Sequence, residues 1–164
     1  MNKIFMLFLF ISLLSFFSAT AQTPAKAVYF EVGGPGIASF NYDMRFTKSE
    51  KGIGGRIGVG FFKFGTFDFN SGNNNTYSIV FIPVGLNYLL GKDEKHYFEL
   101  GAGATIVSTN DSDDKLSNTF GHLNFGYRQQ SKKGGFFFRV AINPIFGKGF
   151  FIPYYGGVAF GYKF

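Results

Sequence analysis

Residues 157–164 read Gly-Val-Ala-Phe-Gly-Tyr-Lys-Phe, and this stretch decides the fold of the chain. Side chains of a β-strand alternate between two faces. One face would carry the large residues Val158, Phe160, Tyr162 and Phe164. The other would carry only glycine, alanine and one lysine, which suits the crowded interior of a small closed barrel, while the large apolar face suits lipid. The stretch therefore predicts a strand of a transmembrane β-barrel.

This pattern resembles the final strand of bacterial outer-membrane β-barrel proteins, in particular the small eight-stranded barrels of the OmpA, OmpX and OmpW type. The residues that carry the resemblance are Phe160, Tyr162 and Phe164. The resemblance implies that they form an assembly signal for the barrel-assembly machinery, with periplasmic chaperones as further partners during biogenesis. It also implies a monomer in the outer membrane of a Gram-negative bacterium, in contact with outer-membrane lipids and lipopolysaccharide.

The same alternation recurs upstream and predicts an all-β fold, a closed antiparallel up-and-down eight-stranded transmembrane β-barrel. The expected strands cover residues 26–34, 39–46, 53–64, 77–90, 96–107, 119–128, 136–146 and 157–164. Pro83 suggests a local bulge, because proline donates no ladder hydrogen bond. Eight strands place both termini on the same side, which the resemblance implies is the periplasm. The expected outer connections are residues 34–37, 65–76, 108–118 and 147–154.

The first 21 residues have the composition of a secretory signal peptide. Lys3 precedes an apolar run at residues 4–17, and Ala19 and Ala21 supply small residues for cleavage. The run is shorter than the roughly 20 residues that a membrane-spanning helix needs. We expect cleavage after Ala21, which leaves residues 22–164 as one transmembrane barrel domain.

Composition narrows the possible functions. The 164-residue chain contains 25 Phe, 9 Tyr and 23 Gly but no Cys and no Trp. Without Cys, a disulfide scaffold and a thiolate metal site are excluded. The formal net charge is +6, yet most lysines lie in short polar turns, as Lys92 and Lys95 do, rather than on one face with interleaved aromatic rings. This arrangement argues against nucleic acid and suits phospholipid headgroups at the periplasmic rim.

Charged residues at inward-facing positions predict a network in the lumen. An eight-stranded barrel has room for side chains and little else, and buried charges must be paired. Lys163 also faces inward. The residues of the expected lumen network are Glu31, Asp43, Arg45, Arg56, Glu99, Arg128 and Arg139. We expect Glu99 to meet Arg128, Arg139 or both, and Asp43 to meet Arg56 or Arg45, because cross-strand neighbours lie about 5 Å apart at Cβ.

The function favoured by this filled lumen is a structural or surface role in the cell envelope, either in envelope integrity or in binding through the outer loops. A porin-like narrow channel for small or hydrophobic solutes is the alternative. A lipid-A-modifying enzyme is the second alternative, since some small outer-membrane barrels use a His with a Ser and an acid. The candidates here are His122 with Ser108, Ser117 and Asp111.

Neither a catalytic site nor a metal site is favoured by the remaining residues. The acidic stretch at residues 111–114 could offer oxygen ligands to Ca²⁺, but it lacks the glycine and the later glutamate of an EF-hand loop. The simpler interpretation of His122 is a structural histidine in the lumen whose ring nitrogens have hydrogen-bond partners. We therefore expect no enzyme activity, no cofactor and no metal. A soluble lipocalin-like barrel is the main fold alternative, and the glycine-lined face argues against it.

Overall fold

The computed structural model describes residues 24–68, 73–109 and 119–164. The strands are β1 (Lys26–Gly33), β2 (Ala38–Arg45), β3 (Gly52–Asp68), β4 (Asn73–Leu90), β5 (His96–Thr109), β6 (Phe120–Gln130), β7 (Gly135–Ile142), β8 (Ile145–Gly147), β9 (Phe150–Ile152) and β10 (Gly156–Lys163). One 3₁₀ turn, η1 (Gly34–Gly36), separates β1 from β2. Within the described ranges, no helix is long and apolar enough to cross a bilayer. The expected signal peptide lies outside these ranges.

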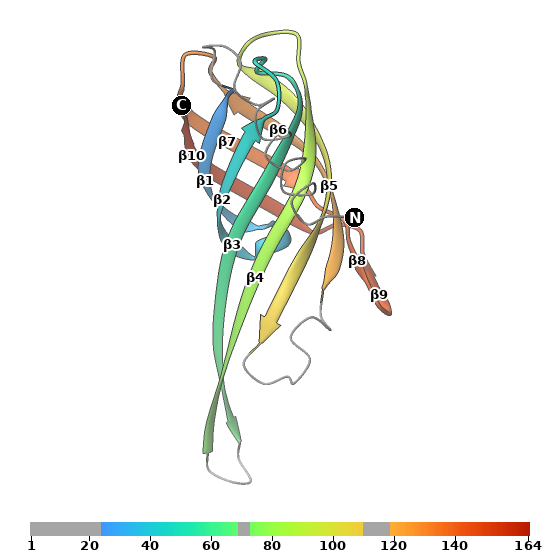
Figure 1. Ribbon diagram of the computed structural model, residues 1–164. Helices are drawn as coiled ribbons and strands as arrows, with labels where there is room; N and C mark the ends of the chain where they lie inside the picture. Colours follow the sequence, from blue (N-terminus) through green and yellow to red (C-terminus); the bar gives the residue numbers. More distant parts are fainter. Residues whose placement is uncertain (1–23, 69–72, 110–118) are drawn as a thin grey trace, which may run out of the picture.

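Eight of the strands close into one antiparallel barrel (Figure 1). The order around the barrel is β1, β2, β3, β4, β5, β6, β7 and β10, and β10 pairs with β1 to complete the ring. At the closing seam Phe30 lies opposite Phe160, and Val28 lies opposite Tyr162. The predicted fold class is therefore confirmed. A closed ring pairs the backbone groups of every wall strand on both sides, as a lipid environment requires.

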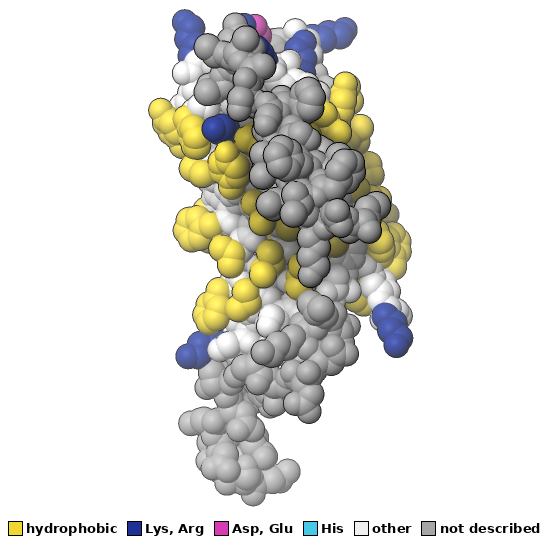
Figure 2. Space-filling model, viewed as in Figure 1, with side chains coloured by type: hydrophobic (Ala, Val, Ile, Leu, Met, Phe, Trp, Pro, Cys, Tyr) yellow, Lys and Arg dark blue, Asp and Glu magenta, His cyan; other side chains and the backbone are white. Residues whose placement is uncertain are grey.

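The alternation of β10 follows the prediction. Val158, Phe160 and Tyr162 are exposed, whereas Ala159 and Lys163 are buried in the lumen. Large exposed hydrophobic residues form a band around the middle of the molecule, with lysine and arginine side chains above and below it (Figure 2). Such a band between polar rims is typical of a barrel wall that faces lipid.

The two ends of the barrel differ. We call the end with the short turns at residues 46–51, 91–95 and 131–134 the turn end, and the opposite end the loop end. In the turn at residues 91–95, the Asp93 carboxylate accepts backbone N–H bonds from His96 at 2.6 Å and Lys95 at 3.0 Å. These bonds hold the pKa of Asp93 below its ordinary value. These bonds therefore stabilise the folded protein at pH values above the ordinary pKa of an aspartate. The stabilisation is lost as the pH falls through the lowered pKa of Asp93.

The segment 65–76, expected to be a loop, is mostly strand. β3 continues to Asp68 and β4 begins at Asn73, so the two strands pair far beyond the barrel wall as one long hairpin (Figure 1). Aromatic and threonine residues at 61–67 favour extended backbone, and this preference outweighs the asparagines that follow. In the segment 108–118, β5 extends to Thr109, and the remainder lies outside the described residues.

The seventh strand, expected at residues 136–146, is interrupted near its far end and resumes as β8 in the same register with β6. β7 ends at Ile142, because Pro144 lacks an N–H and interrupts the ladder. The chain then forms a small hairpin of β8 and β9, and β8 pairs with β6, opposite Gly121 and His122. The connection expected at residues 147–154 therefore contains a strand.

The bulge expected at Pro83 is also absent from the register. Ile57 pairs with Val84 and Gly60 pairs with Phe81, so the same register holds on both sides and no residue is inserted. The β3–β4 ladder is instead interrupted between these pairs, where Pro83 has no N–H to donate.

Candidate functional site

The lumen holds a chain of ion pairs in which arginines and carboxylates alternate. Arg56 Nη1 lies 3.4 Å from Glu31 Oε2, and Arg139 Nη1 lies 3.3 Å from Glu31 Oε1. Arg139 Nε in turn lies 3.5 Å from Glu99 Oε1. Glu31 and Glu99 are 1% exposed, so these pairs are shielded from water. One half of the predicted network is thus a continuous run across β3, β1, β7 and β5.

The second half centres on Asp43. Arg128 Nη1 lies 3.4 Å from Glu99 Oε2, and Arg128 Nη2 donates to Asp43 Oδ1 at 2.8 Å. Arg45 Nη2 donates to the same oxygen at 2.9 Å. Asn87 donates to Asp43 Oδ2 at 2.5 Å. The structure therefore brings all seven predicted residues into one connected network, with an arginine at each end.

One expected partner of Asp43 lies elsewhere. Asp43 and Arg56 are register neighbours on β2 and β3, yet the Arg56 guanidinium reaches Glu31 instead. Arg45 and Arg128 already occupy the Asp43 carboxylate. Of the two expected partners, Arg45 is the one that Asp43 contacts.

Amide side chains add hydrogen bonds to the network, and sequence reasoning did not place them in it. Asn124 donates to Glu99 Oε1 at 2.9 Å and accepts from Arg139 Nη2 at 2.5 Å. Asn87 accepts a hydrogen bond from Arg45 as well as donating to Asp43. The sequence feature that could have indicated this role is an inward-facing asparagine followed by an outward-facing aromatic residue, which occurs on both strands.

Two stacked rings pack against the arginines. Tyr29 and Phe137 lie 4.6 Å apart between ring centroids, with 12° between their planes. The Arg128 guanidinium carbon lies 4.7 Å from the Phe137 centroid, within cation–π range. Arg139 Nη1 donates to the Tyr29 hydroxyl at 3.3 Å. These rings fill lumen space that water would need for a passage.

The turn end of the lumen is covered by a side chain from the β2–β3 turn. Glu50 Oε1 accepts from Lys163 Nζ at 2.5 Å, and Glu50 Oε2 accepts from Gln130 Nε2 at 3.1 Å. Lys163 Nζ also donates to the Lys132 carbonyl at 2.8 Å. Glu50 was missed as a lumen residue because turn residues carry no alternation to show which way they point.

The loop end is covered by η1, which was expected to be an outer connection. Gly34, Pro35 and Gly36 are all buried. A Cβ on Gly36 would lie 2.6 Å from Ser39 Cβ and 3.4 Å from the Pro83 ring, so the backbone rests directly on lumen side chains. The β1–β2 connection therefore folds into the barrel.

The comparisons with known proteins agree with this architecture. No family model and no curated protein matches the sequence. The crystal structure of the N-terminal β-barrel domain of Pseudomonas aeruginosa OprF matches with a TM-score of 0.54 and 11% identity, over 87% of this chain and 98% of that one. The chain has the fold of the small outer-membrane β-barrels. The Yersinia pestis outer membrane protein Ail, determined in a phospholipid bilayer nanodisc, matches with a TM-score of 0.53 and 12% identity, over 88% of this chain and 99% of that one.

His122, the histidine considered for catalysis, is buried in the lumen of this barrel. Its Nδ1 lies 3.3 Å from Thr105 Oγ1. Ser108 pairs with Val80 on the outward-facing side of β5, while Ser117 and Asp111 lie outside the described residues. The acidic stretch 111–114 also lies outside them. Within the described part of the chain, no three His, Cys, Asp or Glu side chains are grouped as metal ligands would be.

A small cavity lies beside His122, inside the lumen. Its volume is about 10 Å³, and Arg56, Glu99 and Asn124 contribute to its wall. One terminal nitrogen of Arg56, Nη2, is buried without a hydrogen-bond partner. The cavity is large enough for about one water molecule, which is far smaller than a solute pathway.

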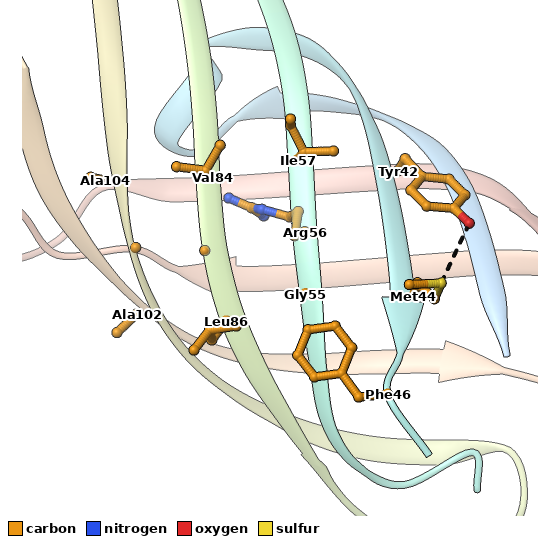
Figure 3. A pocket seen from close by; sticks show the side chains of 12 residues that line it. Tyr42, Met44, Phe46, Gly55, Arg56, Ile57, Val84, Leu86, Ala102 and Ala104 are labelled. Atoms are coloured by element: carbon orange, nitrogen blue, oxygen red, sulfur yellow. Dashed lines mark hydrogen bonds between the residues drawn. The ribbon is translucent and has the colours of Figure 1, made fainter. Parts of the chain in front are cut away.

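Much larger hollows lie on the outer wall. One groove of about 570 Å³ runs across β2 to β5, where the small residues Gly55, Ala102 and Ala104 lie between larger side chains (Figure 3). The Tyr42 hydroxyl donates to Met44 Sδ at 3.8 Å along its edge. Apart from Arg56, whose side chain passes behind the wall, the groove is lined by apolar side chains and glycines. It suits an acyl chain better than polar chemistry.

Proposed function

We propose that this protein is an integral outer-membrane barrel with a lumen closed by side chains, and that it has a structural or surface role in the cell envelope. The observation that carries the proposal is the ion-pair network of buried arginines and carboxylates. Glu50 covers this network at the turn end and η1 covers it at the loop end. A closed lumen neither conducts solutes nor holds a substrate inside the barrel.

The outer surface supports the membrane assignment. Phe40 is 68% exposed and Phe136 is 61% exposed, on opposite sides of the closing seam. In water, each square ångström of such surface costs roughly 25 cal/mol. The fold shared with two outer-membrane proteins supports the same location.

The proposed partners follow from this location. Outer-membrane lipids and lipopolysaccharide would surround the band, and the barrel-assembly machinery and periplasmic chaperones would act during biogenesis. Phe160, Tyr162 and Phe164 lie exposed along one face at the end of β10, where an assembly signal could be recognised. The proposal includes a monomer without enzyme activity.

The membrane assignment is tested by refolding residues 22–164 from urea with and without detergent. We expect β-sheet circular dichroism and a shifted migration of unheated protein in gels only when detergent or lipid is present, because the exposed band needs an apolar solvent. Stable monomeric folding in plain buffer would contradict the proposal.

The closed lumen is tested by conductance in planar bilayers. The wild type should give almost no steady current, because side chains fill the lumen. The paired substitution Glu99→Ala with Arg128→Ala removes one acid and one base and should open stepwise current. A charge-neutral control is the exposed pair Glu94→Ala with Lys132→Ala, which should leave conductance unchanged. Steady wild-type openings would favour the channel.

A further inference from the structure

The hairpin of β8 and β9 is made almost entirely of apolar residues and extends the sheet beyond the end of β7 (Figure 1). Phe146 pairs with Phe151, and all three residues of β9 are exposed. Phe151 is 64% exposed. A lone two-stranded hairpin is marginally stable in water, and exposed rings make it less so. The hairpin therefore needs an apolar environment.

The inward face of the hairpin rests on the barrel. Ile145 is buried opposite His122, and the Phe150 ring meets the Phe120 ring edge-on at 6.3 Å. These contacts hold the hairpin at a defined place on the loop end. They leave Phe146 and Phe151 on the other face.

That outward face continues the lipid-facing wall without a gap. Phe146 pairs with Gly121, and a Cβ on Gly121 would overlap the Phe146 ring, so the ring lies directly on the β6 backbone. Leu123 and Phe125 follow along the same side of β6. The outward face of the hairpin is therefore part of the apolar band and not a separate patch.

The length of the band points to lipid as the occupant. On β7 the outward side chains run from Phe136 to Ile142. At about 3.3 Å per residue and a tilt of about 40°, this stretch spans about 15 Å of a band that is about 25 Å tall. If the row of outward side chains is extended to Phe146, its height across the membrane becomes about 25 Å. The hairpin therefore supplies the part of the wall that β7 lacks.

We propose that the β8–β9 hairpin is embedded in the outer interface of the membrane, with Phe146 and Phe151 among the lipid chains and Lys148 at the phosphate groups. Lys148 is exposed in the turn between the two strands, where a cation can reach headgroups while its stem stays in apolar surroundings. The occupant is a phosphate-bearing lipid of the outer leaflet. This inference rests on the proposed membrane location.

The chain contains no Trp, so a single introduced Trp reports on one place. Phe151→Trp is placed in vesicles of phosphatidylglycerol and phosphatidylcholine that are brominated either near the headgroup or near the chain end. Phe160→Trp, on the lipid-facing side of β10, is the control for lipid contact. Ser49→Trp, in an exposed turn, is the control for water. Shifted migration of unheated protein verifies that each variant folds.

We expect Phe151→Trp to lose most of its emission with bromine near the headgroup and less with bromine near the chain end. Phe160→Trp should be quenched in at least one of the two kinds of vesicle, and Ser49→Trp should keep its emission in both. If Phe160→Trp is quenched and Phe151→Trp is not, the hairpin inference is overturned while the membrane assignment stands. If Phe160→Trp is not quenched either, the membrane assignment itself fails.

Two further variants test the lysine and the rival occupant. Adding Lys148→Glu to Phe151→Trp should weaken the quenching, whereas adding Lys133→Glu, at the turn end, should not. Equal quenching in both would overturn the phosphate contact. The chain also has no Cys, so Phe151→Cys is a unique cross-linking site. Efficient cross-linking of two copies in vesicles would assign the hairpin to a contact between copies and overturn the lipid proposal.

Discussion

Replacing Asp43 with Ala should lower the free energy of unfolding in detergent by about 3–5 kcal/mol, because it leaves buried arginines without their carboxylate. Asp43 is fully buried and pairs with Arg45 at 2.9 Å and Arg128 at 2.8 Å. Arg128 keeps Glu99 at 3.4 Å, but Arg45 keeps only neutral acceptors. Urea unfolding, followed by tryptic cleavage or circular dichroism, measures the change.

Two variants identify the cause of the loss. Asp43→Asn keeps the shape of the side chain and removes its charge, so it should be nearly as unstable as Asp43→Ala if charge pairing is responsible. Glu94→Ala breaks the exposed pair with Lys132, whose atoms are 2.7 Å apart, and should leave the unfolding midpoint unchanged. If Asp43→Ala unfolds at the same urea concentration as the wild type, the claim that the network stabilises the barrel is contradicted.

The alternation of side chains across the wall could be predicted because it depends on neighbours along one strand. On β10, for example, Phe160 must face the side opposite Ala159 whatever the rest of the chain does. A closed ring of eight strands then followed from length and from the need to pair every backbone group. These inferences needed no knowledge of distant contacts.

The ends of strands were harder to place, because they depend on competing local preferences. At residues 65–76 β3 and β4 continue to pair although the composition is typical of a loop. At Pro144 one missing N–H interrupts a strand that the alternation predicts to continue. The inward fold of η1 has a further cause. Gly34 adopts φ 66°, a backbone conformation that glycine enters freely, so the chain can turn into the lumen there.

Contacts across the lumen were the least accessible to sequence reasoning. Register predicts partners on adjacent strands, as for Glu99 on β5 and Arg128 on β6. It does not show that Arg128 also reaches Asp43 on β2, because that distance depends on the tilt and stagger of the whole barrel. Register did not predict the partners of Glu50 either, because Glu50 lies in a turn and its partners Lys163 and Gln130 come from other strands.

Gly161→Val should prevent proper closure of the barrel, because there is no space for a side chain at this point of the seam. Gly161 on β10 lies opposite Tyr29 on β1 and Phe137 on β7. A Cβ there would overlap the Val28 carbonyl oxygen and lie 2.5 Å from Tyr29 Cα. These are backbone atoms, so a change of rotamer cannot relieve the clash.

The expected result is a loss of about 3 kcal/mol or more, at the upper end of what overpacking costs, because two strands must separate. The share of unheated protein with shifted migration, together with the urea midpoint, measures it. Gly156→Ala is the matched control on the same strand, since its Cβ would have no atom closer than 3.9 Å. If both variants fold equally well, β10 can shift at the seam to make room for a side chain. The close contact of Gly161 with Val28 and Tyr29 would then not be required for closure of the barrel.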